Sequence, residues 1–269
     1  MINSICEIAR KASEIILNAD RNYSVFLPAG YAENTDKKYP VLYLLHGMNG
    51  TNEDWPGRGH LKDVIDQLRA SGEVCDMIVI MPNAGGNIYD EVWNGYFDME
   101  GWAYERFFFE EFLPTIEKQY RIKGEKSSRA IAGLSMGGGG STSYAQRHAD
   151  MFAACYAMSA LMHLPPASAE HVATGNKMAL LTDAANRYSC VDYVKGADEA
   201  RKQQLRSVQW FIDCGDDDFL FDCNLDLYQE MRKARIACQL RVRDGGHTWE
   251  YWHSALYTAL PYFSRIFGK

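Results

Sequence analysis

The chain has 269 residues, 47% of them hydrophobic and 23% charged, and its formal net charge is −7. This composition predicts one globular domain with a well-buried core. The acidic balance argues against a nucleic-acid partner, which binds to a basic face, and the apolar runs are too short for us to expect a membrane partner.

Short β-rich apolar runs alternate with longer helical stretches, a pattern typical of an α/β fold with a mostly parallel central sheet and helices on both faces. In chain order we predict a hairpin of strands 14–17 and 23–27, then strands 41–45 and 78–81 separated by a helix over 61–70. A loop rich in glycine and aromatic residues spans 84–102. The remaining predicted elements are helix 104–119, strand 129–132, helix 141–148, strand 152–158, strand 208–213, helix 225–234, strand 239–242 and helix 251–267.

Residues 161–206 interrupt this alternation. The segment is polar and carries Pro165-Pro166 near its start, which is typical of an inserted helical cap or a long loop. The chain shows no repeat, no low-complexity tract and no linker. We therefore predict a single catalytic domain over residues 1–269 that carries this insertion.

The cysteines give no sign of a metal or redox site. The seven are irregularly spaced and form no CxxC pair, so we expect most of them to be reduced, buried side chains. We also find no phosphate-binding loop, and we expect no metal and no cofactor. Residues 1–7 do not read as a signal peptide, so the chain as it stands predicts a cytoplasmic protein, or a secreted or periplasmic one if a signal was removed. The oligomeric state is left open.

A Gly-x-Ser-x-Gly motif at residues 133–137 places Ser135 between a predicted strand and a helical run. In that context the serine lies on a sharp turn, with its hydroxyl exposed as a nucleophile. The helix that follows points its amino-terminal N–H groups toward a developing oxyanion. The same five-residue pattern also occurs by chance as a plain glycine-rich turn. The strand before it, the helix after it and the partners downstream favour the catalytic interpretation.

A serine hydroxyl needs a histidine base, and in this class of fold the base follows the acid in the chain. Among the seven histidines, His247 and His253 lie late enough. His247 stands in a glycine-containing loop directly after the strand predicted over 239–242, whereas His253 falls inside the predicted final helix. We predict that His247 is the base.

The acid is expected at the carboxyl end of the strand predicted over 208–213. Asp216, Asp217 and Asp218 all follow Gly215 there. The usual spacing, Gly-x-x-Asp, selects Asp218, and Asp216 remains a competitor. The carboxylate would hold the imidazole in the correct tautomer and stabilise the imidazolium.

A His-Gly pair at residues 46–47 closes the strand predicted over 41–45. We predict that the backbone N–H groups of Met48 and Met136 form an oxyanion hole, and that His46 is structural. Taken alone, the pair also fits a plain strand-ending turn.

Aromatic residues cluster in the loops expected near this site, where they suit stacking on a phenolic acyl group or a sugar face. We predict that Trp55, Trp93 and Trp249 bind substrate. The alternative is that these side chains only pack the loops. The whole aromatic set is Trp55, Tyr89, Trp93, Tyr96, Phe97, Trp102, Trp249 and Trp252.

Together, the motifs at 43–47, 81–83, 132–138, 213–220 and 246–252 resemble the esterase D-like group of the α/β-hydrolase superfamily, and the similarity runs from about residue 13 to residue 267. The group includes feruloyl and acetyl-xylan esterases of the first carbohydrate-esterase family, S-formylglutathione hydrolases and mycolyltransferases. The resemblance implies an α/β-hydrolase fold and the triad Ser135, Asp218 and His247. The glycine run 137–140 and the Gly-His-x-Trp ending favour the feruloyl esterases.

The leading hypothesis is therefore a serine esterase that acts through an acyl-enzyme on a small-molecule or oligosaccharide ester, most naturally a feruloyl or acetyl ester of plant cell-wall polysaccharide. An S-formylglutathione hydrolase or a broad short-chain acylesterase is the first alternative. A mycolyltransferase-like acyltransferase is another, because hydrolysis and transfer share the acyl-enzyme. A non-catalytic carbohydrate-binding relative is disfavoured by the intact triad.

Overall fold

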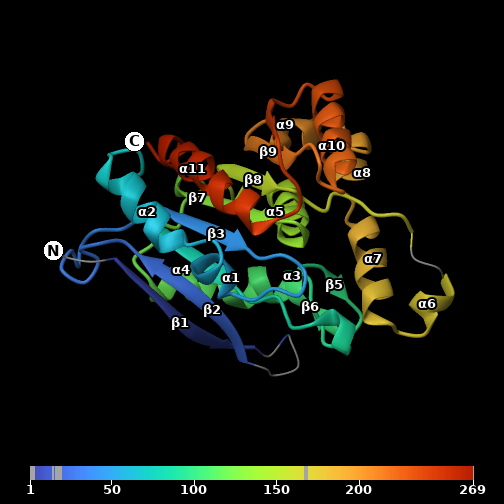
Figure 1. Ribbon diagram of the computed structural model, residues 1–269, viewed down its shortest axis with the longest axis horizontal. Coiled ribbons are helices and arrows are strands. Elements are labelled where there is room, and N and C mark those ends of the chain that lie inside the picture. The colour runs from blue at the N-terminus through green and yellow to red at the C-terminus, as the bar shows by residue number, and fades with distance from the viewer. Residues whose placement is uncertain (1–3, 14, 16–19, 167–168, 269) are drawn as a thin grey trace.

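A computed structural model describes residues 4–13, 15, 20–166 and 169–268. These residues form an eight-stranded sheet in the order β1-β2-β4-β3-β7-β8-β9-β10, with antiparallel pairing at β1–β2–β4 and parallel pairing throughout the rest (Figure 1). The strands are β1 (Ile5–Ala12), β2 (Asp20–Leu27), β3 (Val41–Leu45), β4 (Ile78–Pro82), β7 (Arg129–Leu134), β8 (Ala154–Met158), β9 (Gln209–Gly215) and β10 (Cys238–Arg243).

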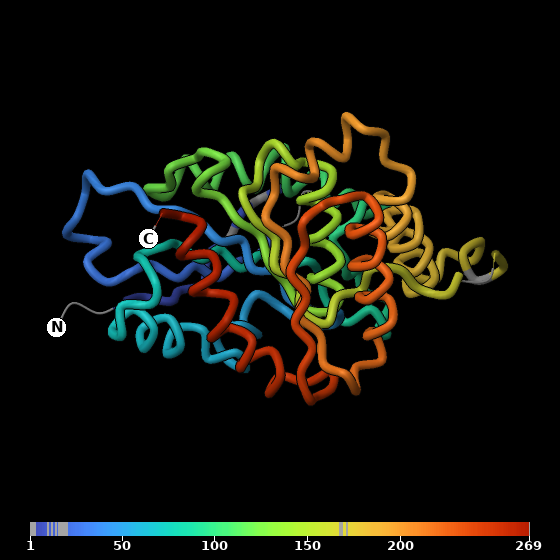
Figure 2. Tube along the Cα trace, turned by 90° about the horizontal axis from the view of Figure 1, so that it is seen from above, coloured from blue at the N-terminus to red at the C-terminus, as the bar shows by residue number. Residues whose placement is uncertain are grey.

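The inner strands β3, β4 and β8 are apolar throughout because helices cover both faces of the sheet. In β3 the side chains alternate: Val41 and Tyr43 pack into the core on one face, and Leu42 and Leu44 pack into the core on the other. One face carries α2 (Leu61–Ala70) and α11 (Trp249–Ile266), which lie side by side in Figures 1 and 2. The other carries α4 (Leu113–Gln119), α5 (Met136–Arg147) and α10 (Phe221–Lys233).

The amino-terminal hairpin is present, but its first strand lies earlier than predicted. β1 begins at Ile5 and pairs with β2 from Ile5↔Leu27 to Ala12↔Asp20. Of the strand predicted over 14–17, only residue 15 is described, and it lies in a bend; the other three positions lie outside the described residues. β1 was not predicted, because an edge strand with exposed charged and apolar side chains lacks the clean alternation of a half-buried strand.

The helix predicted over 104–119 is helical throughout but not uniform. It consists of α3 (Tyr104–Arg106), the π-helical η2 (Phe107–Phe112) and α4. α5 begins at Met136, five residues before the predicted helix start at 141, because the glycine run itself is helical. A Cβ on Gly138 would lie 2.6 Å from that of Ala160, so glycine here allows close packing against the chain after β8.

The inserted segment forms short helices with side-chain caps. α7 (Lys177–Arg187), α8 (Cys190–Lys195) and α9 (Glu199–Leu205) begin after Asn176, Ser189 and Asp198, whose side chains accept a backbone N–H of the first turn. α8 packs against α5 and α10, and α6 (Ala169–Ala173) and α7 project at one end of the molecule (Figures 1 and 2). Residues 167–168 lie outside the described part of the chain. Among the described residues, no helix combines the length and apolar character needed to cross a bilayer.

Candidate active site

Ser135 occupies the tight turn between β7 and α5. Its backbone has φ 54° and ψ −121°, a conformation that is costly for a residue other than glycine and persists only where its surroundings hold it. The surroundings do so through three hydrogen bonds. The Ser135 N–H donates to the Met158 carbonyl at 2.9 Å, and the Ser135 carbonyl accepts from the N–H groups of Gly139 and Leu161 at 3.1 and 2.9 Å.

Two later loops bring a histidine and a carboxylate to this serine. His247, in the loop after β10, has its Nε2 2.9 Å from the Ser135 Oγ, and its Nδ1 lies 3.0 and 2.9 Å from the two oxygens of Asp218, in the loop after β9. Because a carboxylate only accepts, Nδ1 carries a proton and donates it to Asp218, which leaves Nε2 free to accept the serine hydroxyl. This is the arrangement that a nucleophilic serine requires.

Asp218 is held as an anion. Burial by itself raises the pKa of this carboxyl, but hydrogen bonds from His247, from the Leu220 N–H and from the Ser159 hydroxyl outweigh burial and hold the pKa below its usual value. The Leu220 N–H donates to Oδ1 at 2.8 Å. The side chain of Asp218 is fully buried and that of His247 is 18% exposed, so solvent reaches the pair only from the imidazole side.

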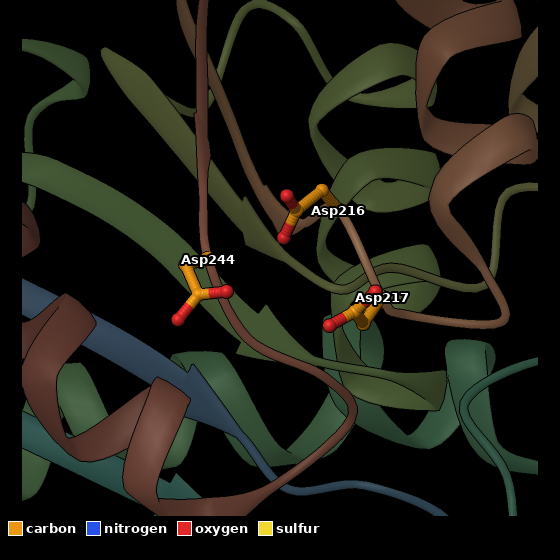
Figure 3. A group of neighbouring side chains, drawn as sticks. All are labelled: Asp216, Asp217 and Asp244. Carbon is orange, nitrogen blue, oxygen red and sulfur yellow. The ribbon is translucent and has the colours of Figure 1, made fainter.

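The alternatives left open by the sequence do not reach the serine. Asp216 is exposed and accepts the Gly245 N–H at 3.2 Å. Figure 3 shows it with Asp217 and Asp244, an exposed acidic group contributed by the chain after β9 and after β10, whose carboxylates lie within 4.8 Å of one another. Exposed acidic groups are common without an ion, and we assign this one no role. His253 lies on α11, with its Nδ1 2.9 Å from the Gly59 carbonyl oxygen.

The loop after β3 lies beside the serine, and His46 shapes it. His46 is buried, and its Nε2 accepts the Ala84 N–H at 2.9 Å. The proton is therefore on Nδ1, which donates to the Gly47 carbonyl at 2.7 Å. Burial lowers the pKa of His46 to about 4, so the ring is neutral. Since the C=O and N–H of a trans peptide point in opposite directions, this bond turns the Met48 N–H away from the His46 ring.

The second predicted oxyanion donor, the N–H of Met136, belongs to the first residue of α5. N–H groups in the first turn of a helix have no intrahelical acceptor, so this donor is available to a ligand. Gly47, Met48 and Ser135 line the same cavity, which has a volume of about 560 Å³. Met48 thus lies in the same cavity as Ser135, and Met136 follows Ser135 directly in the chain; their role as oxyanion donors stays a prediction.

Aromatic side chains form much of the cavity wall, but only one of the three predicted tryptophans lines it. Trp249 does, with the Arg58 guanidinium 5.0 Å over its ring. Phe219, 75% exposed, and Trp252 also line the cavity and were not predicted to bind substrate. The position of Phe219 directly after Asp218 is the signal that could have identified it.

The assignments of Trp55 and Trp93 need correction. Trp55 is fully buried, donates its indole N–H to the Leu45 carbonyl at 3.0 Å, and packs edge-on against Trp249 at 5.2 Å. A fully buried ring cannot touch a substrate, so Trp55 supports the wall from behind. Trp93 does not line this cavity; it stacks on Trp102 with ring centroids 6.2 Å apart.

Comparison with known proteins places this geometry in a family. The model of the Esterase family matches residues 13–263. A solved structure titled ferulic acid esterase is 60% identical, covers 100% of both chains and superposes with a TM-score of 0.94. The endo-1,4-beta-xylanase/feruloyl esterase of Xylanibacter ruminicola is 36% identical over 48% of this chain, and the acetyl esterase of Caldicellulosiruptor saccharolyticus is 24% identical over 84% of each chain.

The aligned region covers only 18% of the Xylanibacter protein, so this chain corresponds to a small part of that relative. The predicted α/β-hydrolase fold, the resemblance to feruloyl esterases and the prediction of a carboxylic ester hydrolase are confirmed. The chain belongs to the Esterase family.

Proposed function

We propose that this chain is a serine esterase that cleaves hydroxycinnamoyl esters, such as feruloyl esters of plant cell-wall polysaccharide, through an acyl-enzyme on Ser135. The observation that carries the proposal is the unbroken series of hydrogen bonds from Asp218 through His247 to the Ser135 hydroxyl, at the edge of an aromatic-walled cavity. The relative that is 60% identical over its whole length is titled ferulic acid esterase, which supports the same substrate class.

Acylation follows from the positions of the three side chains. The Ser135 Oγ attacks the ester carbonyl carbon while His247 Nε2 takes the hydroxyl proton. The carbonyl oxygen becomes an oxyanion and accepts hydrogen bonds from the N–H groups of Met48 and Met136. As the tetrahedral intermediate collapses, the C–O bond to the alcohol breaks, and the imidazolium returns its proton to the leaving oxygen. The acyl group is then esterified to the serine.

Deacylation repeats the sequence with water. His247 takes a proton from a water molecule that attacks the acyl carbonyl carbon, and the same N–H groups stabilise the second oxyanion. Collapse breaks the bond to the Ser135 Oγ, which takes the proton back from the imidazolium. The free acid leaves and the enzyme is restored. Throughout, Asp218 remains an anion and stabilises the charged imidazole.

The cavity suits an aromatic acyl group. Its volume of about 560 Å³ lies within the range of small-molecule sites, and Phe219, Trp249 and Trp252 present ring surfaces to it. A planar hydroxycinnamoyl group can stack on or pack edge-on against such rings. An acetyl group would leave most of this surface uncovered, so the walls favour the larger acyl group.

We also retain the prediction of a single catalytic domain in which residues 161–206 form an inserted cap. The Leu161 N–H donates to the Ser135 carbonyl, and the Cys190 N–H donates to the Met162 carbonyl at 3.1 Å. Leu161, at the start of the insertion, therefore contacts the turn that carries Ser135, which supports a packing of the insertion against this part of the domain.

The substrate class is tested by comparing hydrolysis of methyl ferulate, p-nitrophenyl acetate and S-formylglutathione by the purified protein. We expect the largest kcat/KM for methyl ferulate. A preference for S-formylglutathione would contradict the proposal and indicate an S-formylglutathione hydrolase. Added glycerol tests transfer: glyceryl ferulate in place of free ferulate would indicate an acyltransferase.

Single substitutions test the mechanism. Ser135→Ala and His247→Ala should each lower kcat by several orders of magnitude, on the order of 10⁴. His253→Ala, a histidine of the same carboxyl-terminal region that does not contact the serine, is the matched control and should leave kcat within about twofold of the wild type. Near-native turnover by Ser135→Ala would refute the assignment of the nucleophile.

A further inference from the structure

Ser159 is a buried polar residue close to the site that the mechanism above does not use. It directly follows β8, is fully buried, and has φ 45°. A non-glycine residue in this left-handed region is held there by its surroundings. Its N–H donates to the Asp213 carbonyl at 2.8 Å, which ties the end of β8 to β9, the strand that leads to Asp218.

The segment that contains Ser159 also supports the nucleophile. The Met158 carbonyl accepts the Ser135 N–H, and the Leu161 N–H donates to the Ser135 carbonyl. Residues 158–161 therefore contact the backbone of Ser135 on one side and, through the Ser159 N–H, the strand that leads to Asp218 on the other. A polar side chain in this segment is well placed to fix the position of one relative to the other.

The direction of the Ser159 hydroxyl follows from its neighbours. The Trp252 indole N–H, which can only donate, lies 3.0 Å from the Ser159 Oγ, so the oxygen accepts this bond and its own proton goes elsewhere. Two acceptors compete for this proton, since a hydrogen bond from the Ser159 hydroxyl lowers the pKa of both the Asp218 carboxyl and the Cys214 thiol. Burial raises the pKa of the Cys214 thiol, which stays protonated and is a weak acceptor. The carboxylate is charged and is the stronger acceptor.

We propose that Ser159 is a positioning residue of the active site, which donates a hydrogen bond to Asp218 and so holds the carboxylate against His247 Nδ1. Trp252 contributes on both sides: it orients the Ser159 hydroxyl, and its ring packs edge-on against the His247 imidazole at 4.8 Å. The inference rests on the proposed function, since it assigns Ser159 to the triad that carries out the ester hydrolysis.

Two substitutions distinguish the effect of losing the Ser159 hydroxyl from the effect of backbone strain at this position. Ser159→Ala and Ser159→Gly both remove the hydroxyl, but only glycine adopts a positive φ without cost. We expect both to lower kcat for methyl ferulate roughly tenfold or more with little change in KM, because a hydrogen bond to a charged group is lost. Glycine should unfold at a higher temperature than alanine. Recovery of kcat in Ser159→Gly would show that backbone strain causes the loss, and would overturn the proposal.

A double-substitution cycle with Asp218 identifies the route of the effect. In an Asp218→Ala background, Ser159→Ala should change kcat by no more than about twofold, because the hydroxyl acts through the missing carboxylate. If Ser159→Ala instead lowers kcat by the same factor with and without Asp218, the residue has a structural role and the proposal is overturned. Cys214→Ala, which removes the other group near the hydroxyl, is the matched control and should retain kcat.

If Ser159→Ala does not fold, Ser159→Cys provides the same test, since a thiol of similar size is a weaker donor. We expect its kcat to fall severalfold, and a wild-type value would contradict the inference. The proposed function fails separately: a wild-type protein that does not hydrolyse any ester in the panel, or an active Ser135→Ala variant, would remove the triad itself. An active wild type with an inactive Ser135→Ala variant and unaffected Ser159 variants would refute only the role of Ser159.

Discussion

His46 makes the stability of this protein depend on pH in a predictable way. The imidazole is fully buried, and burial lowers its pKa from 6.5 to about 4. In the unfolded chain the ring gains a proton below pH 6.5, whereas in the folded protein it does so only near pH 4. Protonation therefore favours the unfolded state over this range. The stability that comes from the neutral ring is fully present above pH 6.5 and is lost as the pH falls toward 4.

The size of the effect follows from the shift. Each pKa unit corresponds to about 1.4 kcal/mol, so this histidine lowers the free energy of unfolding by about 2 kcal/mol at pH 5 and about 3 kcal/mol at pH 4, relative to pH 7.5. Solvent does not screen this effect, because the His46 ring is buried. Such a change is large compared with the total stability of an ordinary domain.

His46→Gln isolates this contribution, because glutamine does not titrate and its amide oxygen can still accept the Ala84 N–H. Urea unfolding of both proteins, followed by tryptophan fluorescence from pH 7.5 to pH 4.5, gives the free energy of unfolding at each pH. Carboxyl groups common to both proteins cancel in the difference. We expect the advantage of the wild type to shrink by about 2 kcal/mol between pH 7.5 and pH 5. A difference that stays constant over this range would refute the reasoning.

Other features of the site give predictions that can be checked by similar means. Asp218→Ala should lower kcat about a thousandfold or more, while Asp216→Ala should leave it near the wild-type value; equal losses in ester hydrolysis assays would contradict the choice of acid. Gly137→Ala should destabilise the fold by about 2 kcal/mol or more, because a Cβ there overlaps the backbone at the end of β3. Gly57, which has open space around it, is the control: urea unfolding should show no loss of stability in Gly57→Ala. Trp249→Ala should raise KM for methyl ferulate roughly fivefold and leave KM for p-nitrophenyl acetate unchanged, since the acetyl group, unlike the feruloyl group, carries no ring to pack on the indole.

Local sequence patterns were sufficient to predict the arrangement around Ser135. A strand, a turn of small residues and a helix form within about fifteen residues of one another, so their consequence for one side chain is visible without the rest of the fold. The predicted start of the helix that follows Ser135, residue 141, lies too late because the contact that explains the true start is not local. Glycine disfavours helices in isolation, and only packing of Gly138 against Ala160, from the chain after the next strand, explains why glycine occupies this helix.

The tryptophans show what the pattern could not decide. Trp55, Trp93 and Trp249 have the same chemistry and all lie in loops expected near the site. The exposure of each ring depends on which other segment packs over it, and that contact is distant in sequence. Trp249 itself covers one edge of Trp55, while Trp93 stacks on Trp102 away from the cavity.

The linear order of residues was enough to determine the kind of chemistry and the order of its participants: a serine on a turn, then an acid and a histidine, each after a strand. Parallel strands end at one edge of a sheet, so these groups had to lie near one another. The folded structure decided which neighbour faces the site. Asp218 rather than Asp216 meets His247, because side-chain direction at a loop is set by packing and hydrogen bonds from segments far apart in the chain.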